Sequence, residues 1–232
     1  MTQNYSCIIP AYNEINRIPG VLEAILRIED LSRIICVDDG STDGTGDFVK
    51  EKFPRVKLVK HFTNKGKAAA VLTGLGLAKE NDNILLLDAD LEYLKTEEIK
   101  TSIELFEKNQ LDCLILHTHY LNFWDLFIRK LLRVPHCMAG TRLIKKTCLV
   151  NVLENKFLKN YQLEIAQNQY LMRNQKMVAY TDITALNTAK TVKDGLVKGI
   201  FEEIEMWKQI IEYAGWSFFI KQTLLFARKK VT

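Results

Sequence analysis

Four consecutive apolar residues, 84–87, lead directly into the carboxylates of Asp88 and Asp90. A short, uninterrupted apolar run is typical of a strand covered on both faces, as the strands of parallel sheets are. Residues i, i+2 and i+4 of an extended chain share one face, so we expect Asp88, Asp90 and Glu92 to project the same way from the end of this strand. Like charges repel unless a cation lies between them. The segment therefore predicts a core strand of an α/β fold with a cation at its carboxyl end.

Short apolar runs alternate with helical patterns through the first half of the chain, and this order predicts a mostly parallel sheet with helices on both faces. We expect strands at 5–10, 33–38, 55–61, 83–88 and 111–119. We expect helices at 17–30, 41–53, 66–81 and 96–109. The second half is less regular, with a strand or turn expected at 139–146, a helix at 163–174 and a strand at 176–183.

The length of 232 residues suits one large α/β domain, 1–188, followed by a helical tail, 189–232, without strands. The net charge of +4 is mild and does not suggest a nucleic-acid partner. Five cysteines, odd in number and without C-x-x-C spacing, predict a reduced protein with no disulfide framework and no zinc site. The start of the chain has no signal-peptide pattern, and no stretch of about 18 apolar residues occurs. We therefore expect a cytoplasmic protein.

Three of the predicted strands end in acidic or polar motifs, namely PAYNE (10–14), VDDGSTDG (37–44) and DADLE (88–92). In open α/β sheets, ligands bind at the carboxyl ends of the strands. Taken singly, each motif has an ordinary structural explanation, because Asp38 or Asp43 could cap a helix and Asp-Gly is a common turn. Together they favour a nucleotide or cofactor site, since burying several carboxylates without partners is costly.

Three other motifs are incomplete. A calcium loop counted from Asp39 puts Lys50 at the twelfth position, where a bidentate Glu is needed. NKGKAAA (64–70) lacks the first glycine of a phosphate loop and the Ser or Thr that follows its lysine. GLGLAK (74–79) lacks the third glycine of a dinucleotide fingerprint. None of these functions is therefore assigned.

Taken in order, PAYNE, VDDGSTD, NKGKAAAVLTG and LLLDADLE resemble the family 2 glycosyltransferases over residues 5–95. The resemblance implies a GT-A fold and a nucleotide-diphosphate sugar donor. Further on, AGTRLIKK (139–146) resembles the S-G-x-R element of the polyprenyl-phosphate sugar synthases, the branch that contains the dolichyl-phosphate mannose and glucose synthases. Residues 159–183 likewise resemble the acceptor-side helix and following strand of that branch. Ala139 stands in place of the usual Ser, and no transmembrane hairpin follows.

The same resemblance implies which cation the acids hold, namely Mg²⁺ or Mn²⁺, which in the family bridges the two phosphates of the sugar donor. Asp88 then faces the ribose and the metal, Asp90 is a direct ligand, and Glu92 replaces a further ligand of a different residue type. Two carboxylates and a diphosphate supply the hard oxygen ligands that these ions prefer. A metal in this position stabilises the leaving nucleotide diphosphate.

Further binding residues follow from the resemblance. The first loop packs on the base and ribose in the family, and its matching residues are Pro10, Tyr12 and Glu14. Asp39 matches a contact to the base, and Lys67 matches a lysine that points toward the nucleotide pocket.

Basic and imidazole side chains in the second half are candidates for the acceptor side. Arg142 matches the arginine of S-G-x-R and is expected to clamp a phosphate, since a guanidinium suits bidentate phosphate binding. Arg129 and Arg133 could do the same or form a solvated helix face. His117 and His119 share a predicted strand face and could be ligands or satisfied structural residues.

The sequence thus predicts a metal-dependent, inverting transferase that moves a hexose from a nucleotide-diphosphate sugar to an acceptor. A hydroxyl acceptor needs a general base, and Glu164 is the acid available on the acceptor-side helix. A phosphate monoester is already anionic, so we favour a polyprenyl phosphate or another phosphorylated acceptor, held by Arg142. Three alternatives stay open: a soluble hydroxyl acceptor with Glu164 as base, a non-catalytic nucleotide-binding domain, and nucleotidyl transfer. The intact D-x-D disfavours the second, and a first loop, PAYNEINR (10–17), that is not rich in glycine and basic residues disfavours the third.

The last part of the tail, 215–230, is apolar but is interrupted by Lys221 and Gln222, so it is too short and too polar to span a bilayer. Aromatic residues beside Arg228, Lys229 and Lys230 suit a helix in the headgroup region, peripheral on the inner face of the membrane. The alternatives are packing on the sheet and contact with a second subunit in a homodimer.

Overall fold

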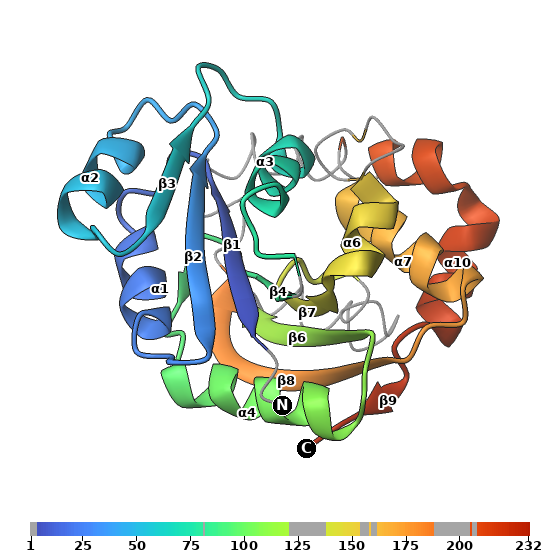
Figure 1. Cartoon of the computed structure of the whole chain (residues 1–232). Coiled ribbons are helices and arrows are strands. Elements are labelled where there is room, and N and C mark those ends of the chain that lie inside the picture. Colours follow the sequence, from blue (N-terminus) through green and yellow to red (C-terminus); the bar gives the residue numbers. More distant parts are fainter. Residues whose placement is uncertain are drawn as a thin grey trace.

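The structure of the chain is a computed structural model, which describes residues 4–80, 82–120, 138–153, 158, 162–187, 205 and 208–232. Its strands are β1 (Tyr5–Ala11), β2 (Leu31–Asp38), β3 (Lys57–Lys60), β4 (Asn83–Leu86), β5 (Leu91–Glu92), β6 (Cys113–Tyr120), β7 (Arg142–Lys145), β8 (Val178–Asn187) and β9 (Lys229–Lys230). Its helices, drawn in Figure 1, are α1 (Ile18–Ile25), α2 (Thr45–Lys52), α3 (Lys67–Leu75), α4 (Thr96–Lys108), α6 (Lys146–Leu153), α7 (Leu163–Arg173) and α10 (Trp216–Leu225).

One sheet joins these strands in the order β3-β2-β1-β4-β7-β6-β8-β5, with β9 beside β8. β3, β2, β1 and β4 run parallel, so their carboxyl ends meet at one edge of the sheet. β7 is antiparallel to both of its neighbours, β4 and β6. The predicted α/β fold, with a mostly parallel sheet and helices on both faces, is confirmed, and the described part of the tail is helical over α10.

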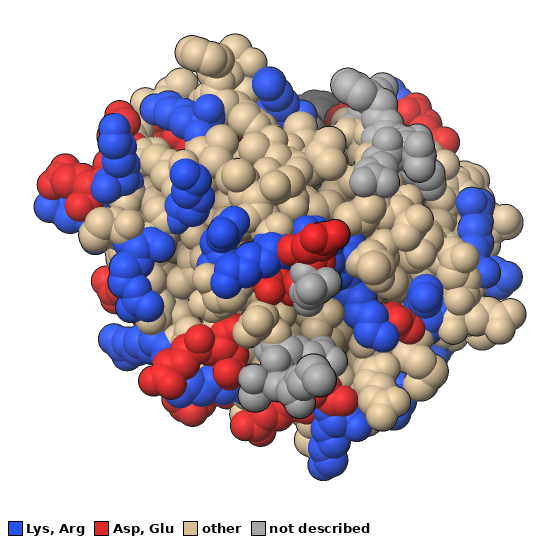
Figure 2. All heavy atoms as spheres, in the orientation of Figure 1, with Lys and Arg blue, Asp and Glu red and all other residues tan. Residues whose placement is uncertain are grey.

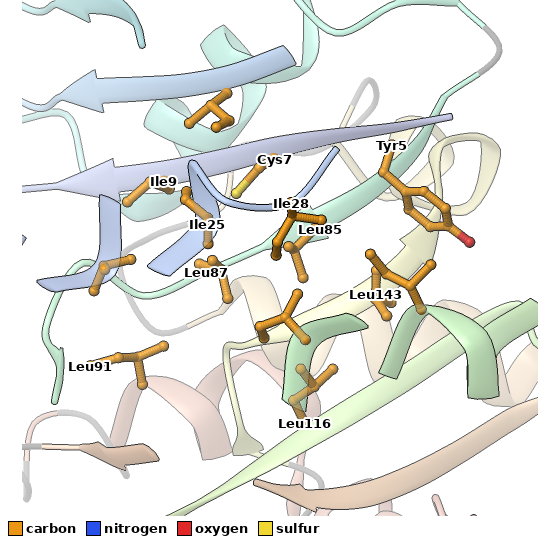
Figure 3. Packing of buried hydrophobic residues seen from close by; sticks show 14 of the residues in the cluster. Tyr5, Cys7, Ile9, Ile25, Ile28, Leu85, Leu87, Leu91, Leu116 and Leu143 are labelled. Carbon is orange, nitrogen blue, oxygen red and sulfur yellow. The ribbon is translucent and has the colours of Figure 1, made fainter. Parts of the chain in front are cut away.

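The alternation of side chains along β1 builds a hydrophobic core on each face of the sheet. Figure 3 shows part of the core beneath α1 and α4, whose members include Tyr5, Cys7, Ile9, Leu85 and Leu143. Ile8 belongs to the second core, under α3 and α6. A Cβ at Gly74 of α3 would lie only 2.6 Å from Ile8 Cγ2, so this glycine allows α3 to lie close on the sheet. The close packing fixes the start of α3, where Lys67 lies, against the edge that carries the strand-end motifs.

The expectation that Asp88, Asp90 and Glu92 share one strand face is wrong. β4 ends at Leu86, the last residue of its ladder with β7, and residues 89–90 form a turn. Glu92 lies in β5, a separate strand that pairs with β8. The alternation rule holds only within a continuous extended chain, and it does not carry across this turn. Asp88 therefore precedes the turn and Asp90 lies in it.

The expectation that the tail contains no strand is also wrong, because β9 pairs in parallel with β8 at Ala179 and Tyr180. A strand of two residues has no periodicity by which the sequence could reveal it. Its two exposed lysines are typical of an edge strand.

Helix α6 was not expected, and the helix expected at 66–81 already ends at Leu75. The division between 1–188 and 189–232 stays a prediction.

One face of the molecule carries mixed charge. Basic and acidic side chains are interspersed over the face shown in Figure 2. In the part of the chain that the structure describes, no helix is long and apolar enough to cross a membrane.

Candidate active site

The first two strand-end loops are tied together by hydrogen bonds. The side-chain oxygen of Asn13 accepts a bond from the Thr42 amide at 2.9 Å. Asp43 accepts bonds from the amides of Ile15, at 3.1 Å, and Thr45, at 2.9 Å. Burial raises the pKa of Asp43, but the bonds from Thr45 and Ile15 outweigh it and hold this pKa below its usual value. The polar residues of PAYNE and GSTD therefore position one another at the carboxyl ends of β1 and β2.

Asp39, at the end of β2, is buried and holds the loop that leads into α3. Its carboxylate accepts bonds from the amides of Lys65, at 3.0 Å, and Gly66, at 2.7 Å. It also lies 2.6 Å from Nδ1 of His61, whose Nε2 lies 2.9 Å from the Thr73 hydroxyl. The predicted contact of Asp39 with the base stays a prediction, and its observed partners belong to the loop 61–66.

Gly40 is required next to Asp39 for two reasons. Its φ of +77° lies in the left-handed region, which glycine adopts without strain. A Cβ there would lie 2.6 Å from the carbonyl carbon of Thr63 and 2.8 Å from the amide nitrogen of Asn64. The glycine of VDDGS thus allows the backbone of the loop 61–66 to approach β2.

The cation that lies beside Asp88 in this structure is the ammonium of Lys67. Lys67 Nζ lies 2.6 Å from Asp88 Oδ1 and 2.7 Å from Glu164 Oε1. The Thr141 hydroxyl donates to the other oxygen of Asp88 at 3.2 Å. Burial lowers the pKa of Lys67, but the Asp88 and Glu164 carboxylates outweigh it and raise this pKa well above its usual value. Lys67 therefore keeps its charge and joins α3, the end of β4 and α7 in one cluster, which we call the lysine cluster.

Gly140 makes room for the lysine cluster. A Cβ at this position would collide with Lys67 Nζ and lie 2.8 Å from both carboxylate oxygens of Asp88. The glycine of AGTR is thus needed because the backbone of 139–141 passes directly over the two charged groups.

Arg142 lies in the interior and has no exposed surface. Its Nε donates to the Ala139 carbonyl at 2.7 Å, and its Nη1 donates to the side-chain oxygens of Gln167, at 3.0 Å, and Asn168, at 2.8 Å. The Asn168 amide donates in turn to Gln222 of α10 at 3.1 Å. The guanidinium thus supports the loop 139–141, and its predicted role as a phosphate clamp stays a prediction.

The first loop presents an aromatic ring to solvent and an acid to a nearby arginine. Tyr12 is 45% exposed, and Pro10 is half-buried beside it in sequence. Glu14 Oε2 pairs with Arg17 at 3.0 Å, and Arg17 Nε lies 3.6 Å from Glu92 Oε1. Glu92 is thus drawn toward α1, and its role as a metal ligand stays a prediction.

The donor set fits a metal that substrate phosphates help to hold. Among the described residues, no three His, Cys, Asp or Glu side chains gather closely enough to hold a metal ion by themselves. Asp88 and Asp90 offer carboxylate oxygens from half-buried positions two residues apart. Mg²⁺ is commonly held by one or two carboxylates together with substrate phosphates, and these two acids suit that arrangement.

The remaining candidates are less central. Nδ1 of His117 lies 2.9 Å from Asp182 Oδ1, which favours the structural alternative for this histidine. Arg129, Arg133 and the side chain of His119 lie outside the described residues.

Sequence reasoning missed His61 and Thr141. His61 follows β3 at the same sheet edge as Asp39, and a fourth strand end there was a signal that could have found it. Thr141 has no comparable signal, because only the tertiary fold brings it to Asp88.

Comparison with known proteins gives related sequences along most of the chain. The sequence profile of the family described as Glycosyl transferase family 2 matches residues 6–170. Dolichyl-phosphate beta-glucosyltransferase of Dictyostelium discoideum is 28% identical over an alignment of 166 residues that covers 65% of this chain and 50% of that protein. Undecaprenyl-phosphate mannosyltransferase of Micrococcus luteus is 35% identical over an alignment of 88 residues that covers 36% of each chain. The matched segments therefore span about half or less of these curated relatives.

Solved structures share the fold at low sequence identity. Glucosyl-3-phosphoglycerate synthase from Mycobacterium tuberculosis, in complex with Mn²⁺, uridine diphosphate and glucosyl-3-phosphoglycerate, has a TM-score of 0.71 and 17% identity. The likeness covers 94% of this chain and 80% of that chain. TarS (1–349) of S. aureus has a TM-score of 0.60 and 18% identity, over 96% of this chain and 69% of that chain. Both likenesses support the GT-A architecture.

Proposed function

The chain belongs to glycosyl transferase family 2, and from this premise we propose that it transfers a hexose from a nucleotide-diphosphate sugar to a phosphorylated acceptor, with inversion at the anomeric carbon. The observation that carries this proposal is the lysine cluster, in which one ammonium contacts Asp88 on the donor side and Glu164 on the acceptor side. It joins an acidic strand end, suited to a metal that binds a diphosphate, to a helix whose acid is already paired with the same ammonium.

The donor half of the site is formed by the strand-end loops. The exposed ring of Tyr12 offers a face on which a nucleotide base can stack. Asp39 keeps the loop 61–66 closed, which fixes the position of Lys67 at the start of α3. Asp88 and Asp90 would hold Mg²⁺ or Mn²⁺ together with the diphosphate. The ion, when bound, offsets the charge that develops on the leaving nucleotide diphosphate.

The acceptor half favours an anionic nucleophile. Glu164 Oε1 lies 2.7 Å from the Lys67 ammonium, so we assign Glu164 to holding Lys67 rather than to removing a proton. A phosphate monoester attacks as an anion and needs no general base, whereas a sugar hydroxyl does. We assign Arg142 to the support of the loop 139–141, because contact with an acceptor phosphate would require its guanidinium to leave Gln167 and Asn168.

Polyprenyl phosphate is the acceptor that we favour. Two of the relatives carry dolichyl phosphate and undecaprenyl phosphate in their names. A small phosphorylated acid is the second candidate, because the synthase from Mycobacterium tuberculosis was solved with uridine-diphosphate-glucose and phosphoglyceric acid. The two candidates share an anionic phosphate and differ in the need for a lipid surface.

The Glu164→Gln variant tests the acceptor class. The amide oxygen can still accept a hydrogen bond from Lys67, so kcat should fall by less than about tenfold if Glu164 only positions the lysine. A general base contributes about 10²–10⁴-fold, and its loss would also change the pH profile of kcat. Steady-state kinetics across a range of pH measure both effects. A loss of about a thousandfold with a changed pH profile would indicate a hydroxyl acceptor and contradict the proposal.

A further inference from the structure

Helix α10 exposes a row of apolar side chains and buries a polar one, while Phe218 and Phe219 of the same helix are half-buried. Trp216 is 63% exposed, Ile220 54% and Leu224 56%. These residues are spaced at i, i+4 and i+8, so they lie along one face of the helix. Gln222, in contrast, is fully buried. A surface helix of a water-soluble protein normally shows the reverse arrangement.

The inward face is held by a buried polar contact. Nδ2 of Asn168 in α7 donates a hydrogen bond to Oε1 of Gln222 at 3.1 Å. Oδ1 of Asn168 accepts a hydrogen bond from Arg142. Turning α10 about its axis to bury Trp216 would separate Gln222 from Asn168. Helix α10 lies beside α7 at the periphery of the molecule (Figure 1). The contact thus holds the side of α10 that carries Gln222 against α7, and the apolar face points away from it.

The chain around this face is basic. Residues 213–232 include Lys221, Arg228, Lys229 and Lys230 and contain no Asp or Glu. Lys230 pairs with Asp182 of β8 at 2.6 Å, so the charge that faces solvent comes mainly from the other three. Lys221 and Arg228 are both exposed. Exposed tryptophan and leucine side chains next to basic residues are the combination that binds the boundary between headgroups and acyl chains. Basic residues near an anionic leaflet strengthen this binding and make it sensitive to salt.

We propose that the exposed face of α10, formed by Trp216, Ile220 and Leu224, docks on an anionic lipid bilayer. With ten residues, α10 is about half the length needed to span a bilayer, so it lies in the plane of the surface. A second copy of the chain is a poorer occupant. In a two-fold contact this face would meet itself, and its basic residues would oppose basic residues. The proposal rests on the chemistry of this face and does not depend on the transfer reaction.

Vesicle flotation of the full chain tests the proposal. The protein should float with vesicles of phosphatidylcholine and phosphatidylglycerol at low salt, and it should float less at high salt and with phosphatidylcholine alone. The variant Trp216→Ser/Ile220→Ser/Leu224→Ser should lose flotation by at least tenfold. The matched control Leu72→Ser/Met177→Ser removes exposed apolar side chains from elsewhere, 45% and 52% exposed, and should float like the unchanged protein.

A charge variant keeps the test independent of the apolar substitutions. Lys221→Glu/Arg228→Glu changes only exposed side chains and should reduce flotation several-fold with anionic vesicles. Circular dichroism before flotation checks that each variant is folded. The proposal is overturned if the unchanged protein stays in the bottom fraction with anionic vesicles, or if both variants float as it does. It is also overturned if sedimentation shows a dimer that the triple serine variant converts to a monomer, while the unchanged protein never floats.

Discussion

Substituting Asp90 by Asn is expected to lower kcat by about 10²–10³-fold and to leave the fold unchanged. The side chain lies in the turn that follows β4 and is half-buried, so the amide fits where the carboxylate was. The amide has no negative charge, so it is a weaker ligand for Mg²⁺ or Mn²⁺ than the carboxylate is. The ion that would offset the charge of the leaving diphosphate is then held less well. Excess chelator should abolish activity of the unchanged protein, and added Mn²⁺ should restore it.

Calorimetry provides a second measurement of the same change. Mn²⁺ should increase the affinity of the unchanged protein for a nucleotide diphosphate, and this increase should be lost in Asp90→Asn. Glu97→Gln is the matched control, since it makes the same chemical change on a side chain that is 80% exposed on α4. Full activity of Asp90→Asn, or of the unchanged protein in excess chelator, would show that the acids after β4 do not hold a catalytic metal.

Substituting Lys67 by Met is expected to affect both stability and activity. Without the ammonium, the Asp88 and Glu164 carboxylates lose their shared partner, and the free energy of unfolding should fall by about 1–3 kcal/mol. The activity should fall by about 10²-fold, because Asp88 and the loop 139–141 are no longer held in place. Thermal denaturation and steady-state kinetics measure the two effects.

The pKa of Lys67 sets the pH range in which its contribution can be measured. Folding raises this pKa above its usual value of 10.5. The stabilisation of the folded state by the charged lysine is therefore complete below about pH 10.5 and is lost only at higher pH. The difference between Lys67→Met and the unchanged protein should therefore not diminish as the pH rises from about 7 to 9.

A double variant separates the two effects of Lys67. In Lys67→Met/Glu164→Gln, one of the two carboxylates that repel each other without Lys67 is also removed. This variant should therefore be more stable than Lys67→Met but no more active. Lys100→Met is the matched control, since Lys100 is 41% exposed and pairs with the exposed Glu97, and it should change stability by less than about 0.5 kcal/mol. If Lys67→Met is as stable and as active as the unchanged protein, the lysine cluster does not organise the site.

The sheet edge of the site could be predicted from the sequence because its signals are local. The apolar run before Asp88 and the acidic ends of β1 and β2 identify strands and the edge at which they stop. The parallel order of these strands then brings the motifs together. Lys67 at the start of α3 contacts Asp88 just after β4, but neither NKGKAAA nor DADLE indicates this contact.

The acceptor side could not be predicted to the same extent, because its contacts join residues far apart in the sequence. Lys67 and Glu164 are 97 positions apart in the sequence. Arg142 contacts Gln167 because it lies in β7, the antiparallel strand between β4 and β6. The turn at 89–90 also interrupts the strand alternation on which the shared face of the three acids was based. The sequence predicted which residues are chemically suited to the site, and the tertiary fold determined which of them meet.

Product analysis shows whether the chain transfers a hexose and to which class of acceptor. The purified full chain is incubated with Mn²⁺, a uridine- or guanosine-diphosphate hexose, and a short polyprenyl phosphate, phosphoglyceric acid or dephosphorylated polyprenol. Mass spectrometry then identifies the product, and the released nucleotide diphosphate is measured in the same reaction. The proposed function requires that one hexose is added to a phosphorylated acceptor for each nucleotide diphosphate released, and that the dephosphorylated polyprenol yields no product. Transfer to the dephosphorylated acceptor alone, or bound nucleotide sugar with no transfer to any acceptor, would contradict it.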